Sequence, residues 1–280
     1  MPIKNMLKSC ILFLGLLIAA PSLIAQRTGD LGVFGGVSYY MGDLNTKKLF
    51  LMPRPSYGAL YRYNINHRLA IQGHYLHGKL EASDAKSKVN PDRNLNFSSP
   101  IDEAGVQFEV NFFEYFIGSK MHWWTPYIFG GGSVFFFKPY GNVNGAKVEL
   151  KPLATEGQGS SVFPGRESYR LYAFSIPFGV GVKVSLSKLI GVGAEWGMRK
   201  TTTDYLDDVS KSYYLNLAGK SPGSASLAEL ASDPTLSHTT GMQRGNSKDK
   251  DWYSFAGITL VVKIRMLSKE RCLDHQREGY

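Results

Sequence analysis

Cysteine is scarce in this chain, which has two cysteines in 280 residues. Cys10 lies in an apolar segment near the N-terminus, and Cys272 lies close to the C-terminus. If the N-terminal segment is a cleaved leader, one cysteine remains, and an internal disulfide is excluded.

The chain also lacks the short motifs of metal, phosphate and nucleophile chemistry. It contains no HExxH or CxxC pattern, no tight histidine cluster and no Gly-x-Ser-x-Gly turn. The loop glycines Gly157 and Gly159 are not followed by Gly-Lys-Ser/Thr, so they do not form a phosphate loop. We therefore expect no catalytic residue, no cofactor and no metal ion.

Long hydrophobic runs are missing after the first 25 residues, so no spanning helix of about 18 or more apolar residues is expected. The first 25 residues have Lys4 and Lys8, an apolar run at 10–20 and a cleavage-like SLIA at 22–25. This pattern predicts a signal peptide, although a signal anchor with a short apolar run is the alternative. The expected organisation is a signal peptide at 1–25, a barrel domain at 26–265 and a short periplasmic tail at 266–280.

The net charge of +9 is compatible with several partners. A basic chain can bind nucleic acid, but an exported protein does not meet it. Anionic lipid headgroups or an acidic periplasmic partner suit this charge better.

The clearest pattern is strict alternation over 173–186, where every even position is apolar from Phe174 to Leu186. Only a strand places alternate residues on opposite faces. The alternation resumes at Ile190 after a tight turn, with Glu195 and Arg199 on the polar face. Strands of soluble sandwiches average about 5–6 residues. Longer strands with charged inner faces favour a transmembrane barrel.

Eight strands are predicted in total, at 31–41, 57–65, 68–80, 103–113, 126–137, 173–186, 190–199 and 251–265. Short connections at 66–67, 114–125 and 187–189 alternate with longer ones at 43–56, 81–102, 138–168 and 200–250. Outer-membrane barrels have short periplasmic turns and long external loops. The predicted fold is therefore all-β, an eight-stranded antiparallel transmembrane barrel in the outer membrane with both termini periplasmic.

Aromatic residues gather at both ends of the predicted strands, as expected for girdles at the two membrane interfaces. Those near the long loops are Tyr39, Tyr40, Tyr57, Trp252 and Tyr253, and those near the short turns are Phe112, Phe113, Tyr115, Phe116, Trp123 and Trp124.

Several charged residues fall on inward positions of the strands: Arg62, Glu103, Glu109, Lys183, Glu195, Arg199 and Lys263. An eight-stranded barrel is just wide enough for its side chains to fill it. Buried charges are costly unless they pair. We expect a charge network that plugs the lumen, with a conducting or substrate-binding lumen as the alternative.

Two other groups of residues were considered as sites. His74 and His77 are three apart on a strand, so they face opposite sides and cannot share a metal. Asp204, Asp207 and Asp208 lack the calcium-loop pattern of EF-hands, and we expect them to be solvated or to pair with the lumen.

Particular motifs in the chain resemble those of one family. They are GGVSYYMGDLN at 35–45, RNLNF at 93–97, LATEGQG at 153–159, EWGMRKT at 195–201, TDYLDDVS at 203–210, QRGN at 243–246 and KDWY at 250–253. Together they closely resemble the PorG-type family, outer-membrane barrels of the Bacteroidetes type IX secretion system. The resemblance covers most of residues 30–265.

The resemblance implies a non-enzymatic role in protein transport and gliding-type systems. Its members are thought to sit in the outer membrane and to associate with a periplasmic ring of a lipoprotein and its partner protein. We expect this partner to dock on the turn at 114–125 and on the tail, through Lys120, His122, Lys269 and Arg271. The alternatives are a general small barrel of the OmpW or OmpX kind, for passive transport or adhesion, and a lipid-modifying enzyme on the barrel wall.

Overall fold

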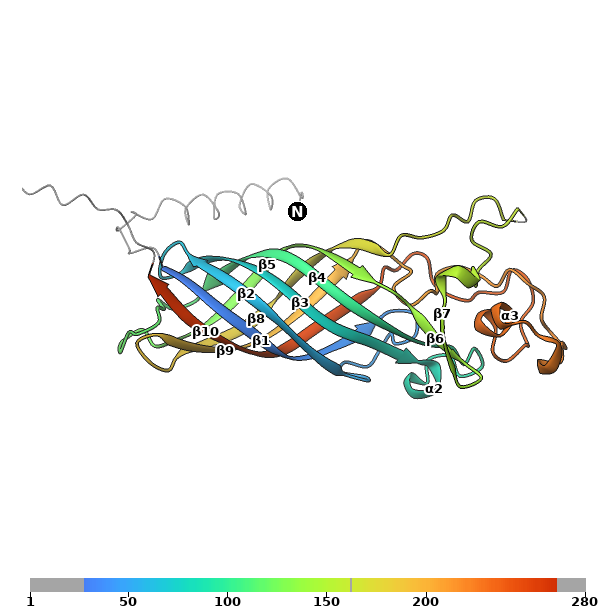
Figure 1. Cartoon of the computed structure of the whole chain (residues 1–280), viewed down its shortest axis with the longest axis horizontal. Coiled ribbons are helices and arrows are strands. Elements are labelled where there is room, and N and C mark those ends of the chain that lie inside the picture. The colour runs from blue at the N-terminus through green and yellow to red at the C-terminus, as the bar shows by residue number, and fades with distance from the viewer. Residues whose placement is uncertain (1–27, 162, 266–280) are drawn as a thin grey trace, which may run out of the picture.

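Eight long antiparallel strands form a closed barrel in the computed structural model, which describes residues 28–161 and 163–265 (Figure 1). Each strand pairs with its neighbours along the chain, and β1 pairs with β10 to close the ring. The strands are β1 Thr28–Met41, β2 Arg54–Asn64, β3 Leu69–Ser83, β4 Asn96–Asn111, β5 Trp124–Phe137, β8 Tyr172–Ser185, β9 Ile190–Thr201 and β10 Trp252–Arg265. The predicted all-β, eight-stranded antiparallel barrel of the outer-membrane type is confirmed.

The register follows from the sequence alternation, because a slip of one residue would turn every side chain to the other face. In β8, Val180 pairs with Ile128 of β5 and Trp196 of β9, and all three side chains face outward. Gly181 faces the lumen. A Cβ there would lie 2.5 Å from the Tyr127 ring, so a glycine is needed for this close approach.

The two predicted sets of connections lie at opposite ends of the barrel, although 112–123 of the short set has 12 residues, as many as 42–53 and 84–95 of the long set. The short ones span 65–68, 112–123 and 186–189, at the end where β1 begins and β10 ends. The longer ones span 42–53, 84–95, 138–171 and 202–251 and lie to the right in Figure 1. We call the end of the barrel with the first set the short-turn end, and the opposite end the long-loop end.

The connection between β3 and β4 is shorter than the predicted 81–102, because both strands continue beyond the expected residues. Pairing runs on to Ser83 and Asn96. Leu80 is fully buried inside, while Glu81 on this extension binds Lys79 and Arg54. The extension therefore has both packing and ion pairs to stabilise it.

The long connections are folded. They contain the hairpin β6 Tyr140–Val143 and β7 Ala146–Glu149, the short helices α2 Asp84–Ser87 and α3 Leu227–Ser232, and the 3-10 turns Lys151–Leu153 and Pro222–Ser224. β6 also pairs with β4 at Ser98. These segments pack together into a structure that we call the cap. In the part of the chain that the structure describes, no helix is long and apolar enough to span a membrane.

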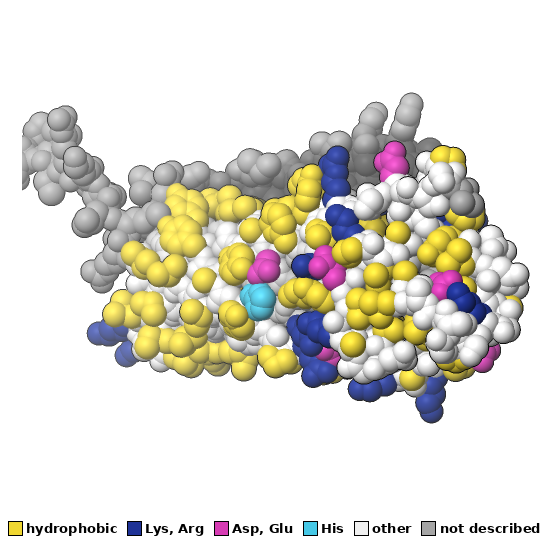
Figure 2. Space-filling model, turned by 45° about the vertical axis from the view of Figure 1, so that its right-hand side comes forward, with side chains coloured by type: hydrophobic (Ala, Val, Ile, Leu, Met, Phe, Trp, Pro, Cys, Tyr) yellow, Lys and Arg dark blue, Asp and Glu magenta, His cyan; other side chains and the backbone are white. Residues whose placement is uncertain are grey.

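Apolar side chains cover the barrel wall, whereas charged side chains gather toward the long-loop end (Figure 2). Phe112, Phe113, Trp123 and Trp124 are exposed at the short-turn end, as a girdle requires. Tyr115 does not belong to this girdle because it is buried.

The predicted girdle at the long-loop end is only partly correct. Tyr57 is exposed there, but Tyr40 and Tyr253 face inward and are fully buried, because they share the face of Phe34 and Phe255. Tyr39 faces outward, yet its ring is covered by Phe50 at a centroid distance of 4.6 Å.

The outward position of Val180, which is 51% exposed, gives a direct test of the apolar wall. Val180→Arg should lower the free energy of unfolding by about 2–4 kcal/mol, the range for a basic residue at the midplane of a barrel's lipid face. Urea unfolding in lipid measures this, with Val180→Ala as the apolar control. An arginine variant as stable as the control would show that this face does not contact lipid.

Candidate functional site

The lumen contains an ion network centred on Glu109, near the short-turn end. The Arg62 guanidinium donates to the Glu109 carboxylate at 2.8 Å and to the Gln72 amide oxygen at 2.8 Å. The Lys183 ammonium donates to the same carboxylate and, at 3.0 Å, to Asn111. These side chains are almost completely buried. The predicted lumen pairing is therefore present for Arg62, Glu109 and Lys183.

A second network surrounds Glu103, nearer to the cap. His74 Nε2 lies 2.9 Å from the Glu103 carboxylate, and Arg199 Nε lies 3.3 Å from it. The Tyr253 hydroxyl donates to the other carboxylate oxygen and contacts Ser175. Glu103 and Arg199 thus pair as expected, and His74 joins them.

Glu195 and Lys263 do not join either ion network. Glu195 accepts a hydrogen bond from the Tyr127 hydroxyl at 2.8 Å. Lys263 donates to the backbone carbonyl of Ile117 at 2.9 Å. Neither side chain forms an ion pair within the described residues, so the predicted pairing with other lumen charges is wrong for these two positions.

Sequence reasoning missed Asp30, His74 and Gln72 as lumen residues. Asp30 lies 3.9 Å from Arg62 and accepts a hydrogen bond from Asn64 at 2.9 Å. The signal for Asp30 is present in the sequence, since it shares the inward parity of Gly32, but the predicted strand starts at Leu31, three residues after the observed start at Thr28. β3 alternates weakly, so its inward residues could not be assigned.

The opposite facing of the two histidines of β3 is confirmed. His77 lies on the outer wall, where its Nδ1 is 2.8 Å from Asp102, and Asp102 also accepts from the Tyr75 hydroxyl at 2.6 Å. Asp102 is a carboxylate on the outer wall that the sequence analysis did not assign. A wall hydrolase would require a serine beside a histidine such as His74, but His74 faces the lumen and its Nε2 contacts Glu103.

The interior of the cap is held together by buried arginines. Arg93 donates to the Asp84 carboxylate at 2.7 and 2.8 Å and to the carbonyl of Arg244 at 2.5 Å. Arg244 contacts Glu156 at 3.2 Å and donates to the carbonyl of Asp208 at 2.6 Å. These bonds join α2 and three long connections, because the residues come from 84–95, 138–171 and 202–251.

The aspartates at 204, 207 and 208 are buried in this cap, so the expectation that they are solvated or pair with the lumen is wrong. Asp208 accepts from the Tyr169 hydroxyl at 2.6 Å and from Thr155 at 2.5 Å, and Asp204 accepts from Ser210 at 2.6 Å. Within the described ranges, no group of histidines, cysteines and acids is arranged to hold a metal ion.

Asp207 has an unusual partner in Asp251. The Tyr40 hydroxyl lies 2.6 Å from a carboxylate oxygen of each. A hydroxyl has one proton to donate, so the second short contact requires a proton on one carboxylate. Burial and the mutual proximity of the two acids raise the pKa of Asp207, in agreement with this arrangement.

The motifs that carry the family resemblance meet inside this cap. Asp43, Arg93, Glu156, Arg244 and Asp251 come from separate motifs. The first four form hydrogen bonds to another connection, and Asp251 accepts one from Tyr40 of β1. Their unusual sequences therefore have a structural role, which is to fold the long loops over the barrel.

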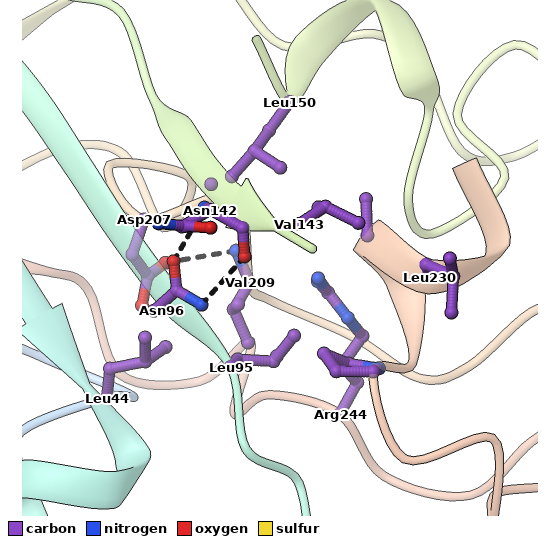
Figure 3. A pocket seen from close by; sticks show the side chains of 13 residues that line it. Leu44, Leu95, Asn96, Asn142, Val143, Leu150, Asp207, Val209, Leu230 and Arg244 are labelled. Atoms are coloured by element: carbon purple, nitrogen blue, oxygen red, sulfur yellow. Dashed lines mark hydrogen bonds between the residues drawn. The ribbon is translucent and has the colours of Figure 1, made fainter. Parts of the chain in front are cut away.

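The cap is well packed. A cavity of about 10 Å³ lies below the β6–β7 hairpin, about enough for one water molecule (Figure 3). Leu95, Val143, Leu150 and Leu230 point toward it, and Arg244 lies at its edge. A cavity of this size does not accommodate an organic ligand.

Among the three short connections, 112–123 is the longest. Met121 at its tip is 85% exposed, Lys120 is exposed and His122 is half-buried with its Nε2 3.8 Å from Glu114. Gly118 N–H donates to Ser185 at 2.8 Å, which fixes the connection to the next turn. The other proposed docking residues, Lys269 and Arg271, lie outside the described residues.

The buried acids of the cap predict that the stability of its folded state depends on pH. Burial raises the pKa of Asp204 to about 7 and that of Asp208 to about 6, above the value of about 3.9 for an unfolded chain. A raised carboxyl pKa favours the folded state at low pH, and this contribution is lost as the pH rises through the folded pKa.

Amide hydrogen exchange at 203–211, corrected for intrinsic rates, should therefore show at least about tenfold less protection at pH 8 than at pH 5, because each folded pKa lies about one unit or more above pH 5. Asp204→Asn should reduce this difference, because the amide does not titrate. Asp249→Asn, in the same connection but exposed, is the matched control. Equal protection at both pH values would contradict the assignment.

The fold and the filled lumen together define a small β-barrel of the outer-membrane type. The chain belongs to the family described as a domain of unknown function, DUF6089, whose model matches residues 8–152. No curated protein matches the sequence.

Several solved barrels are similar in architecture. The attachment invasion locus protein Ail of Yersinia pestis is 9% identical, with a TM-score of 0.42, covering 86% of this chain and 100% of that one. OprG of Pseudomonas aeruginosa is 9% identical, with a TM-score of 0.38 and coverages of 86% and 99%. The N-terminal barrel of OprF from the same organism is 11% identical, with a TM-score of 0.36 and coverages of 85% and 98%.

Proposed function

We propose that this protein is a non-enzymatic outer-membrane component of a type IX secretion machine, which anchors or docks the periplasmic ring at the outer membrane. In this arrangement the cap faces the cell exterior and the short-turn end faces the periplasm. The observation that carries the proposal is the combination of a filled lumen with a folded, exposed connection at the short-turn end.

The filled lumen favours docking over passive transport. Ion pairs span the lumen at two heights. Glu109 pairs with Arg62 and Lys183 at one height, and Glu103 pairs with Arg199 at the other. Opening a path would require separating buried charges, and removal of one partner of such a pair costs about 3–5 kcal/mol. A barrel without a path acts through its ends and its wall.

The connection 112–123 has the features of a protein contact. It presents the exposed side chain of Met121 beside Lys120, and its backbone is held by bonds to neighbouring turns. Methionine and aromatic residues are enriched in the cores of interfaces. The motif resemblance supports the identity of the partner as the ring lipoprotein and its partner protein.

Purification from mild detergent tests this function. The wild-type barrel should retain both ring proteins, and a Lys120→Glu/Met121→Asp variant should retain several-fold less, because it places acidic charge on a contact surface. Lys248→Glu, exposed on the cap, is the control and should leave retention unchanged. Absence of ring proteins from the wild-type preparation would sink the proposal in favour of a general small barrel for adhesion or passive transport.

A further inference from the structure

A cavity of about 220 Å³ opens at the short-turn mouth of the lumen, below the Glu109 network. Its lining includes Lys263 from β10, Asn64 from β2, His67 from the turn 65–68, and Tyr115 and Phe116 from the connection 112–123. These residues combine nitrogen donors with aromatic faces. In contrast to the water-sized cavity of the cap, this one has room for side chains of another molecule.

Lys263 is the charged group of this cavity. It faces the lumen, because its neighbours Val262 and Ile264 are exposed on the outer wall. Its ammonium donates to the carbonyl of Ile117 and lies 5.6 Å from the centre of the Phe116 ring. An ammonium has three protons to donate, so this carbonyl leaves donors for a ligand.

Lys263 differs in this respect from the other cations of the lumen. Arg62, Lys183 and Arg199 each contact a buried carboxylate, whereas Lys263 has no ion pair within the described residues. The nearby Asp30 already accepts from Asn64 and faces Arg62. A cation that is half-buried and lacks an acidic partner attracts an anionic ligand.

The rim of the mouth has the same sign of charge. The three short connections contain Arg68, Lys120 and Lys188, all exposed, against one acid, Glu114. His67 stacks on Phe116 at a centroid distance of 5.0 Å. This surface is complementary to an acidic chain.

We propose that the mouth cavity is a docking site for an acidic peptide segment of a periplasmic partner. One carboxylate of the segment pairs with Lys263, and the imidazole of His67 supplies a further hydrogen-bond donor. Phe116 packs against the aliphatic part of the same side chain. The position inside the mouth favours a peptide over a lipid headgroup, because lipids surround the outer wall and do not enter the lumen. This site adds a partner surface to the proposed docking function. It rests on that function, which places the short-turn end in the periplasm.

Fluorescence anisotropy on the full chain in detergent tests the site, with labelled tetraglutamate and tetraglutamine as probes. Tetraglutamate should bind at least about tenfold more tightly than tetraglutamine, a difference in binding free energy of about 1.4 kcal/mol. Its binding should weaken with added salt. Lys263→Met should remove this preference, and Lys263→Arg should retain it. Lys188→Met, a lysine of the rim outside the cavity, should change the affinity less than twofold.

Several results would overturn the proposal. One is a Lys263→Met variant that is folded, as judged by heat-modifiability, and binds like the wild type. Another is equal weakening of binding by Lys188→Met, which would indicate a general charge effect. Displacement of the peptide by short-chain phosphatidylglycerol would place a lipid headgroup in the cavity. Tighter binding after removal of 266–280 would show that the chain's own tail occupies it. Because the purified chain is used, these results are independent of ring retention.

Discussion

The rest of the structure depends on the pairing of charges inside the barrel. Glu109 is fully buried, and its carboxylate is compensated by Arg62 and Lys183 from strands on other parts of the ring. A buried carboxylate is costly unless its charge is paired. Here both cations bind Oε2 of Glu109, while Oε1 has no hydrogen-bond partner among the described residues. The pairing therefore fixes which strands face each other across the lumen, and it fills the space that a channel would need.

The cap extends this principle to the long-loop end. Arg93 and Arg244 bind backbone carbonyls and carboxylates of distant connections, so that residues far apart in sequence become one packed unit. Two carboxylates that share the Tyr40 hydroxyl require an extra proton, which makes the cap sensitive to pH. With the lumen filled and the interior of the cap packed, the groups available to partners lie on the outer surfaces and at the short-turn mouth.

Much of the barrel was predictable from the sequence because period-two alternation is a local signal. The fourteen residues at 173–186 gave β8 almost without error, and the asymmetry of the connections gave the topology. The start of β2 was missed because Arg54 and Pro55 resemble a turn. The first part of β4, with Ser98, Ser99 and Pro100, has no apolar alternation, so it was read as a loop.

The cap and the finer lumen contacts were beyond sequence reasoning for a physical reason. Inward parity identified Lys263 as a lumen residue, but parity does not reveal the height of a side chain in the barrel, and at its height Lys263 meets the carbonyl of Ile117 instead of an acid. The cap depends on hydrogen bonds between connections more than a hundred residues apart, such as Arg93 to the Arg244 carbonyl. No local pattern encodes such contacts.

The central claim is that paired side chains fill the lumen, so that the protein acts through its surfaces. Single-channel recording of the intact chain in a planar bilayer tests it most directly, with a known porin as the positive control. The account predicts insertion without unitary current steps at neutral pH. Stable, ohmic steps from the purified protein would contradict it, because they require a continuous aqueous path past Glu109 and Glu103.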